Sequence, residues 1–191
     1  LAARALHQRA LDQTSGDRCA SALLAAALTI HDLEVRYFEP GTRAGEGVLG
    51  FLDRPAFIVH LAKGQSGEDE AVVTAHEIGH FELHRDPRSD VTMIAPGLGG
   101  DKTDGGVPAA QGYSPKERKE VQADVFAGEF LCPSDWLRSE LLAGRRDIPG
   151  LARDLGLPFG LLMNQAVRAL LLPPLRLRDP DAPAPKYELD E

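Results

Sequence analysis

The sequence has little cysteine, no long apolar segment and no excess of positive charge, and each shortage excludes a class of protein. Its two cysteines, Cys19 and Cys132, are too few for a disulfide scaffold and form no C-x-x-C pair. Both have apolar neighbours, so we expect reduced, buried thiols and a cytoplasmic protein. The net charge of -8 argues against a chain that acts as a nucleic-acid-binding surface.

The most apolar stretch, "ALLAAALTI" at 22–30, is far shorter than the ~20 residues needed to cross a bilayer. No basic segment followed by an apolar one marks a signal peptide. We therefore expect no association with a membrane. The chain begins at Leu1 rather than Met, which suggests a piece of a longer protein.

The remaining composition is that of a globular protein. The 191 residues are 43% hydrophobic and 26% charged, enough for one domain with a core and a small appendage. Apolar periodicity predicts an α+β fold. Helices are expected over 2–13, 17–31, 67–85, 114–131, 134–144, 148–156 and 158–172, a strand over 33–39, and a hairpin over 47–53 and 56–62. The expected divisions are a core over 1–133, a helical appendage over 134–172 packed on it, and a Pro-rich tail over 173–191.

The segment "AVVTAHEIGHFELHRD" (71–86) contains His76-Glu77-x-x-His80. On a helix, His76 and His80 share a face with Cβ atoms about 5–6 Å apart, so two imidazoles can converge on one Zn²⁺. Glu77 then lies where it can act as general base. The alternative is an amphipathic helix with solvated histidines. His84 would lie about 12 Å along a straight helix from His76, too far to share the metal, so we interpret it as a structural or rim residue.

The third ligand must come from elsewhere, and the helix predicted over 114–131 offers it. Glu120 and Asp124 share one face there; Glu120 can bind the metal, and Asp124 can accept the N–H of a ligating histidine. Glu117 and Glu129 are rivals, although Glu117 forms a capping box with Ser114. For the oxyanion of a hydrolytic reaction, Tyr113 and His60 are the candidate donors.

Two blocks, "TAHEIGHFELH" (74–84) and "EVQADVFAGEFLCP" (120–133), resemble the ImmA/IrrE family of bacterial zinc metallo-endopeptidases. The resemblance implies His76, His80 and Glu120 as zinc ligands and Glu77 as base. It also implies zincin-like helices packed on a small, mainly antiparallel sheet, with a helix–turn–helix-like appendage. Family members are thought to cleave helix-turn-helix repressors in bacterial stress, DNA-damage or phage-related responses, which would make a repressor the protein substrate.

The tail ends in "KYELDE" (186–191), which resembles the lead-in to the first nucleotide-binding motif of UvrD-like helicases. We therefore expect a fused helicase domain beyond Glu191. The alternative function is a non-catalytic, zinc-containing regulatory or DNA/protein-binding module of such a protein. Strong nucleic-acid binding is not expected, because the second helix of the helix–turn–helix-like pair offers only Asn164, Gln165 and Arg168 as polar contacts.

Overall fold

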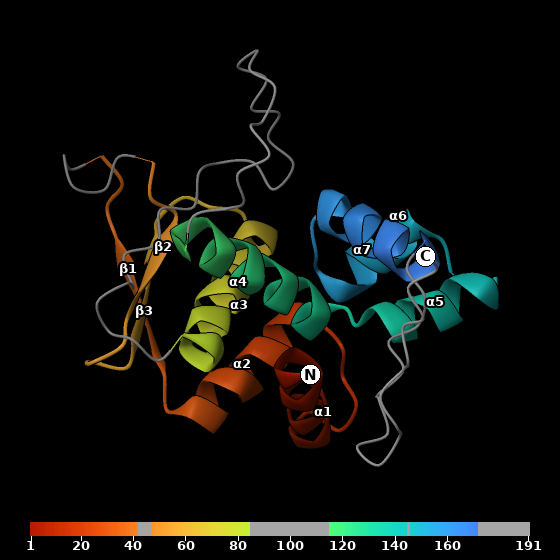
Figure 1. Ribbon diagram of the computed structural model, residues 1–191, viewed down its shortest axis with the longest axis horizontal. Helices are drawn as coiled ribbons and strands as arrows, with labels where there is room; N and C mark the ends of the chain where they lie inside the picture. The colour runs from red at the N-terminus through yellow and green to blue at the C-terminus, as the bar shows by residue number, and fades with distance from the viewer. Residues whose placement is uncertain (42–46, 85–114, 145, 172–191) are drawn as a thin grey trace, which may run out of the picture.

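The computed structural model of the chain describes residues 1–41, 47–84, 115–144 and 146–171, where seven helices pack with a three-stranded sheet (Figure 1). The helices are α1 (Ala2–Gln13), α2 (Ala20–His31), α3 (Gly67–Leu83), α4 (Pro115–Leu131), α5 (Ser134–Leu142), α6 (Ile148–Leu155) and α7 (Phe159–Leu171). The strands are β1 (Glu34–Phe38), β2 (Gly50–Asp53) and β3 (Ile58–Ala62). Ser114 and the predicted Pro-rich tail lie outside the described residues.

The sheet has the order β1-β3-β2, and its two strand pairs differ in direction. β1 runs parallel to β3, and β2 runs antiparallel to β3 as the predicted hairpin. The α+β class with helices packed on a small sheet is therefore confirmed, and the sheet is mixed. The parallel pair arises because the chain leaves β1, reaches the opposite edge at β2, and reverses direction in the turn before β3.

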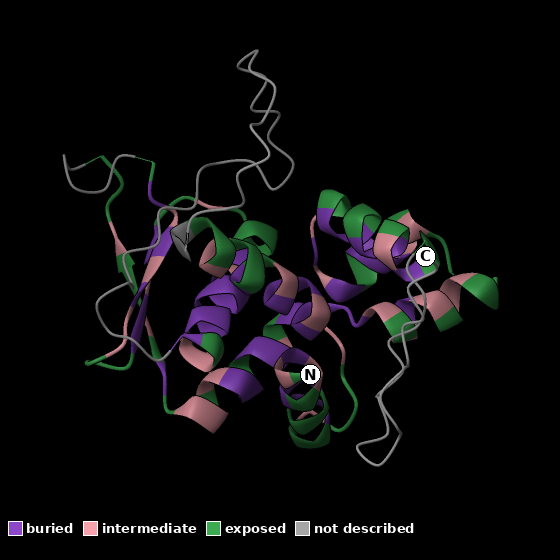
Figure 2. Cartoon of the chain, viewed as in Figure 1, coloured by how far each residue is buried: buried purple, intermediate pink, exposed green. Residues whose placement is uncertain are grey.

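Helix α3 lies between the sheet and the other core helices (Figure 1). Its start is well defined, because the Ser66 hydroxyl accepts a hydrogen bond from the Asp69 backbone N–H and three acidic residues occupy the first turn. Every residue from Ala71 to His80 is buried, which Figure 2 shows as a continuous buried stretch. A helix buried on all its faces must place its polar residues against specific partners.

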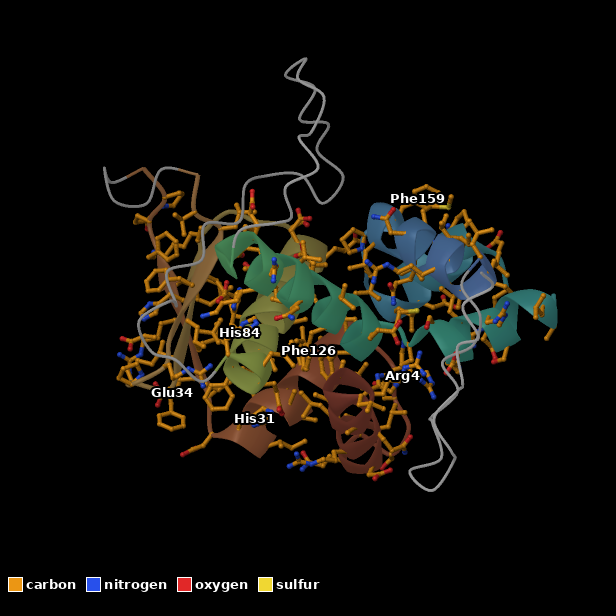
Figure 3. All side chains as sticks on the ribbon, viewed as in Figure 1. Arg4, His31, Glu34, His84, Phe126 and Phe159 are labelled. Atoms are coloured by element: carbon orange, nitrogen blue, oxygen red, sulfur yellow. The ribbon has the colours of Figure 1, made fainter. Side chains whose placement is uncertain are left out.

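The first helix is held against the end of α4 by buried polar contacts. His7 Nδ1 lies 2.6 Å from the Phe130 carbonyl and donates to it, which leaves Nε2 to accept from Arg18 at 2.7 Å. Arg4 binds Glu129 at 2.8 Å and also contacts Ser134 and Asp135 at the start of α5 (Figure 3). These contacts fix the C-terminal end of α4, so they also fix the direction in which its N-terminal half runs.

The last three helices form the predicted helix–turn–helix-like group. Helix α6 ends at Gly156, whose left-handed conformation (φ 65°, ψ 44°) lets the chain turn into α7. Gln165 of α7 is buried and donates to the Cys132 carbonyl at 2.9 Å. Apolar residues of α6 and α7, such as Leu151 and Leu162, belong to one buried cluster with Leu6 of α1. The boundary predicted at residue 133 stays a prediction.

None of the helices within the described ranges combines the length and the hydropathy needed to cross a membrane.

Replacing Gln165 with Leu should destabilise the protein. The substitution removes the hydrogen bond that the buried Cys132 carbonyl accepts from the side chain, which costs about 1–3 kcal/mol of unfolding free energy. The measurement is denaturant unfolding of both proteins. The neighbouring Asn164 is exposed, so Asn164→Leu is a matched control that should change stability by less than about 0.5 kcal/mol. Equal stabilities for the two variants would contradict the assigned contact.

Candidate metal centre

Helix α3 places three chemically active side chains in the middle of the protein. His76, Glu77 and His80 have 3%, 0% and 1% of their surface exposed. His76 and His80 are one helical turn apart, and their Nε2 atoms face each other at 3.0 Å. The interpretation of this helix as an amphipathic helix with solvated histidines is therefore wrong, because both imidazoles are buried and turned toward each other.

Helix α4 can approach α3 closely because residue 79 is a glycine. A Cβ atom at Gly79 would lie 3.2 Å from both the Cα and the carbonyl oxygen of Ala123, and 3.1 Å from the Phe126 ring. Those distances leave no room for a side chain without movement of the α4 backbone. The close approach brings Glu120 and Asp124, one turn apart on α4, against the two histidines. Gly79 was not recognised from the sequence, although its position between the two histidines could have suggested a packing role.

Three side-chain atoms form a small triangle where the two helices meet. Glu120 Oε2 lies 3.4 Å from His76 Nε2 and 3.6 Å from His80 Nε2. Donor atoms about 2.0–2.1 Å from a tetrahedral metal lie about 3.3 Å from one another, which matches all three edges of this triangle. Two imidazole nitrogens and one carboxylate oxygen are also a donor set that suits such an ion. His76, His80 and Glu120 can therefore hold a metal ion.

The far side of the His76 ring is held by a carboxylate. Asp124 Oδ1 lies 2.8 Å from His76 Nδ1, so the ring donates its Nδ1–H and directs Nε2 toward the triangle. Metal-binding histidines usually make this kind of hydrogen bond, because it fixes the ring orientation and the tautomer. The Asp124 side chain is 44% exposed, so this edge of the cluster is the one nearest solvent.

The charges of the cluster shift the pKa values of its members in opposite directions. Burial by itself lowers the pKa of His76, but hydrogen bonds with Asp124 and Glu120 and the charge of Glu77 outweigh it and raise that pKa to about 9. Burial by itself raises the pKa of Glu120, yet its hydrogen bonds with His76 and His80 hold that pKa at about 2. The metal-free cluster thus carries a proton on His76 that a bound cation would replace.

The rivals for the third ligand position are not part of the triangle. Glu129 pairs with Arg4 at 2.8 Å near the other end of α4. Glu117 is exposed in the first turn of α4. Of the candidates on this helix, Glu120 is the one that the structure brings to both histidines.

The two candidate oxyanion donors have different outcomes. Tyr113 lies outside the described residues, so its role stays a prediction. His60 does not reach the cluster: on β3 its neighbours Val59 and Leu61 face the core, and its own ring stacks on Phe51 with ring centres 4.4 Å apart. It lies on the face of the sheet that points away from α3, so its proposed role as a donor is wrong.

His84 is not in the triangle, but it touches it. Helix α3 ends at Leu83, and the buried His84 ring has its Nδ1 atom 2.9 Å from His80 Nδ1. Its Nε2 atom lies 3.0 Å from Gln122 Oε1 on α4, and Figure 3 places His84 where α3 and α4 lie side by side. The expectation of a structural residue holds, whereas a position at an exposed rim does not. Gln122 was not identified from the sequence, where nothing distinguishes it from a solvated residue.

This arrangement of two helices agrees with a comparison against known protein families. The model of the IrrE N-terminal-like domain family (Peptidase_M78) matches residues 28–166, more than half of the chain. The chain belongs to this family. It therefore carries a metallopeptidase-like domain, and the match contains every residue of the triangle as well as Glu77 and Asp124. A search of curated proteins and a search of solved structures found no match to this chain.

Replacing Gly79 with Ala should weaken metal binding and stability together. The added methyl group forces α3 and α4 apart, at a cost of about 1–3 kcal/mol, and moves Glu120 away from the histidines. We expect Zn²⁺ affinity to fall about tenfold or more, measured by competition with a chelator. Gly160 in α7 has open space where a Cβ would be, so Gly160→Ala is the control and should be neutral or stabilising. Unchanged Zn²⁺ affinity in Gly79→Ala would contradict the role of this contact.

Zn²⁺ affinity should rise by about tenfold per pH unit between about pH 6.5 and 8. His76 must lose its proton to bind a metal, and its raised pKa of about 9 means that it still carries that proton throughout this range. Chelator competition at several pH values measures the slope. Asp124→Asn removes a carboxylate that raises the pKa of His76, so this pKa falls. The Zn²⁺ affinity of this variant should therefore stop rising at a lower pH than that of the wild type. A wild-type affinity that does not change over this range would contradict the protonated cluster.

Proposed function

We propose that this chain is a zinc-dependent endopeptidase that hydrolyses a peptide bond in a protein substrate. The observation that carries the proposal is the triangle of His76, His80 and Glu120 beside the buried Glu77. The donor set and its spacing support zinc, because two imidazoles and one carboxylate leave a fourth position open, as in catalytic zinc sites. Membership of a peptidase family supports hydrolysis.

In this proposal each residue of the cluster has a separate task. His76, His80 and Glu120 hold the ion, and Asp124 orients the His76 ring. When bound, zinc supplies a Lewis acid that polarises the scissile carbonyl and makes water more acidic. The Glu77 carboxylate takes a proton from the attacking water as the new C–O bond forms. It then delivers this proton to the leaving nitrogen as the C–N bond breaks. Tyr113 is the proposed donor to the oxyanion.

The biological setting belongs to the same proposal and rests on the resemblance to the ImmA/IrrE family. It comprises a cytoplasmic location for this chain and a helix-turn-helix repressor as its substrate, cleaved in a bacterial stress, DNA-damage or phage-related response. A fused helicase domain beyond Glu191 is proposed on the sequence of the tail. The prediction that this chain does not bind nucleic acid strongly remains a prediction. It is supported by the exposed side of α7, where Phe159, Met163 and Val167 offer no hydrogen bonds to bases.

Replacing Glu77 with Gln should abolish cleavage while leaving the metal in place. The amide keeps the shape of the side chain but cannot take a proton from water, so we expect turnover to fall by at least about 100-fold. The measurement is the appearance of new peptide termini, by mass spectrometry, in a proteome-derived peptide library and in purified repressors. Glu68→Gln removes an exposed carboxylate at the start of the same helix and is the control with wild-type activity.

Metal content of the same proteins separates the outcomes. Wild type and Glu77→Gln should each carry one zinc per chain, whereas Glu120→Ala should lose it or bind it more weakly. Wild-type turnover in Glu77→Gln would overturn the assigned base. Zinc at full occupancy with no cleavage of any substrate would instead favour the non-catalytic, zinc-containing module.

A further inference from the structure

His80 and His76 are supported differently on the side of the ring that points away from the triangle. His76 donates to the Asp124 carboxylate, whereas His80 faces a second imidazole, that of His84. We propose that His84 and Gln122 are positioning residues that fix the proton of His80 on Nδ1 and so leave its Nε2 lone pair for the metal. This inference rests on the proposed function, because the position of that proton matters only if His80 is a ligand.

The contacts form a continuous chain from α4 to the centre of the triangle. Gln122 Oε1 lies 3.0 Å from His84 Nε2, His84 Nδ1 lies 2.9 Å from His80 Nδ1, and His80 Nε2 belongs to the triangle. Both distances are those of hydrogen bonds. The two histidines are buried, so water does not substitute readily for a missing partner.

The chemistry of neutral imidazole makes this chain directional. Each neutral ring has one N–H and one lone pair, so an oxygen that accepts from His84 Nε2–H leaves His84 Nδ1 as an acceptor. His84 Nδ1 must then accept from His80 Nδ1–H, and His80 Nε2 keeps its lone pair. If the amide of Gln122 were turned so that it donated, the same logic would put a proton on His80 Nε2 and block the metal. The orientation of one amide on α4 is thus coupled to the readiness of a ligand on α3.

The backbone around His84 is built to hold the ring in this place. Helix α3 stops at Leu83, and His84 adopts an extended conformation (φ -119°, ψ 96°) that ends the helix. The Arg54 guanidinium, from the turn between β2 and β3, donates to the carbonyls of His80, Phe81 and His84 at 2.7, 3.1 and 2.6 Å. It also stacks on the Phe81 ring at 4.8 Å. A cation at the end of a helix stabilises such carbonyls, so the turn that carries Arg54 fixes the position of His84.

The two kinds of support also differ in charge. The Asp124 carboxylate supports His76 with a negative charge, whereas the side of His80 that points away from the triangle faces an imidazole and, beyond it, an amide. A buried carboxylate beside His80 would add a further negative charge to those of Glu77 and Glu120, which burial makes costly. A neutral chain that ends at Gln122, near the surface of α4, supplies the same hydrogen bond without that charge.

The test is Zn²⁺ affinity of the full chain, measured by chelator competition, for Gln122→Met and His84→Phe. Both substitutions keep the approximate volume of the side chain and remove an acceptor from the chain of contacts. Loss of the group that orients a metal-binding histidine weakens binding by about 10- to 100-fold, and we expect that range for both variants. Gln122 is exposed, so Gln122→Met keeps the test valid even if His84→Phe proves unstable.

A second readout separates positioning from general packing. Nitrogen-15 NMR of the zinc-loaded wild type should show the proton of His80 on Nδ1 and that of His84 on Nε2. Gln122→Glu, which can only accept, should restore or exceed wild-type affinity and keep this proton pattern. Val121→Glu is the matched control, because it adds the same charge at an exposed neighbouring position on α4 that does not face His84. Because Val121→Glu leaves Gln122 in place, it should keep the proton pattern and change Zn²⁺ affinity by no more than about twofold.

The results distinguish the failure of this inference from the failure of the proposed function. If the wild type binds Zn²⁺ and Glu120→Ala loses it, but Gln122→Met and His84→Phe bind with wild-type affinity, the positioning role is overturned and the metal centre stands. A proton on His80 Nε2 in the metal-free wild type, or an equal increase in Zn²⁺ affinity in Gln122→Glu and Val121→Glu, would overturn it as well. If the wild type binds no Zn²⁺, both proposals fail together.

Discussion

The contact between α3 and α4 at Gly79 is the constraint on which the rest of the site depends. Because residue 79 has no side chain, the backbone at Ala123 can lie directly against α3. Only at that separation do Glu120 and Asp124 reach His76, and only then does Gln122 reach His84. The sheet and α2 pack against other faces of α3, so the distance between α3 and α4 is set by packing around the whole of α3.

That packing places a group of ionisable residues where water is largely excluded. Burying such groups is costly unless each is hydrogen-bonded or paired with an opposite charge. His76, between Asp124 and Glu120, meets this requirement through the opposite pKa shifts of the imidazole and the carboxylate. Because water is largely excluded, the local dielectric constant is low, and every electrostatic interaction inside the cluster is stronger than in water. A fully apolar core at this place would stabilise the fold more, but it would lack the ionisable groups that the cluster supplies.

Among the described residues of the cluster, the side chains on α4 are the more exposed ones. The ligands on α3 are almost fully buried, while the Glu120 and Asp124 side chains are 26% and 44% exposed. The support of each histidine follows the same division: a carboxylate near solvent orients His76, and a neutral chain in the interior holds His80 through His84.

Part of the site could be assigned from the sequence because local helix geometry places those residues together. Residues four apart on a helix share a face, so His76, His80 and the adjacent Glu77 could be assigned from their spacing, as could most helices and the hairpin. Tertiary structure decided the rest, because a second helix can present any of its faces. It placed Glu120, rather than Glu117 or Glu129, against the histidines, and it placed His60 on the other face of the sheet. It also made the sheet mixed and determined the contacts of Gly79, His84 and Gln122. Spacing along one element specifies neighbours within it, whereas contacts between elements depend on how closely, and at what angle, they pack.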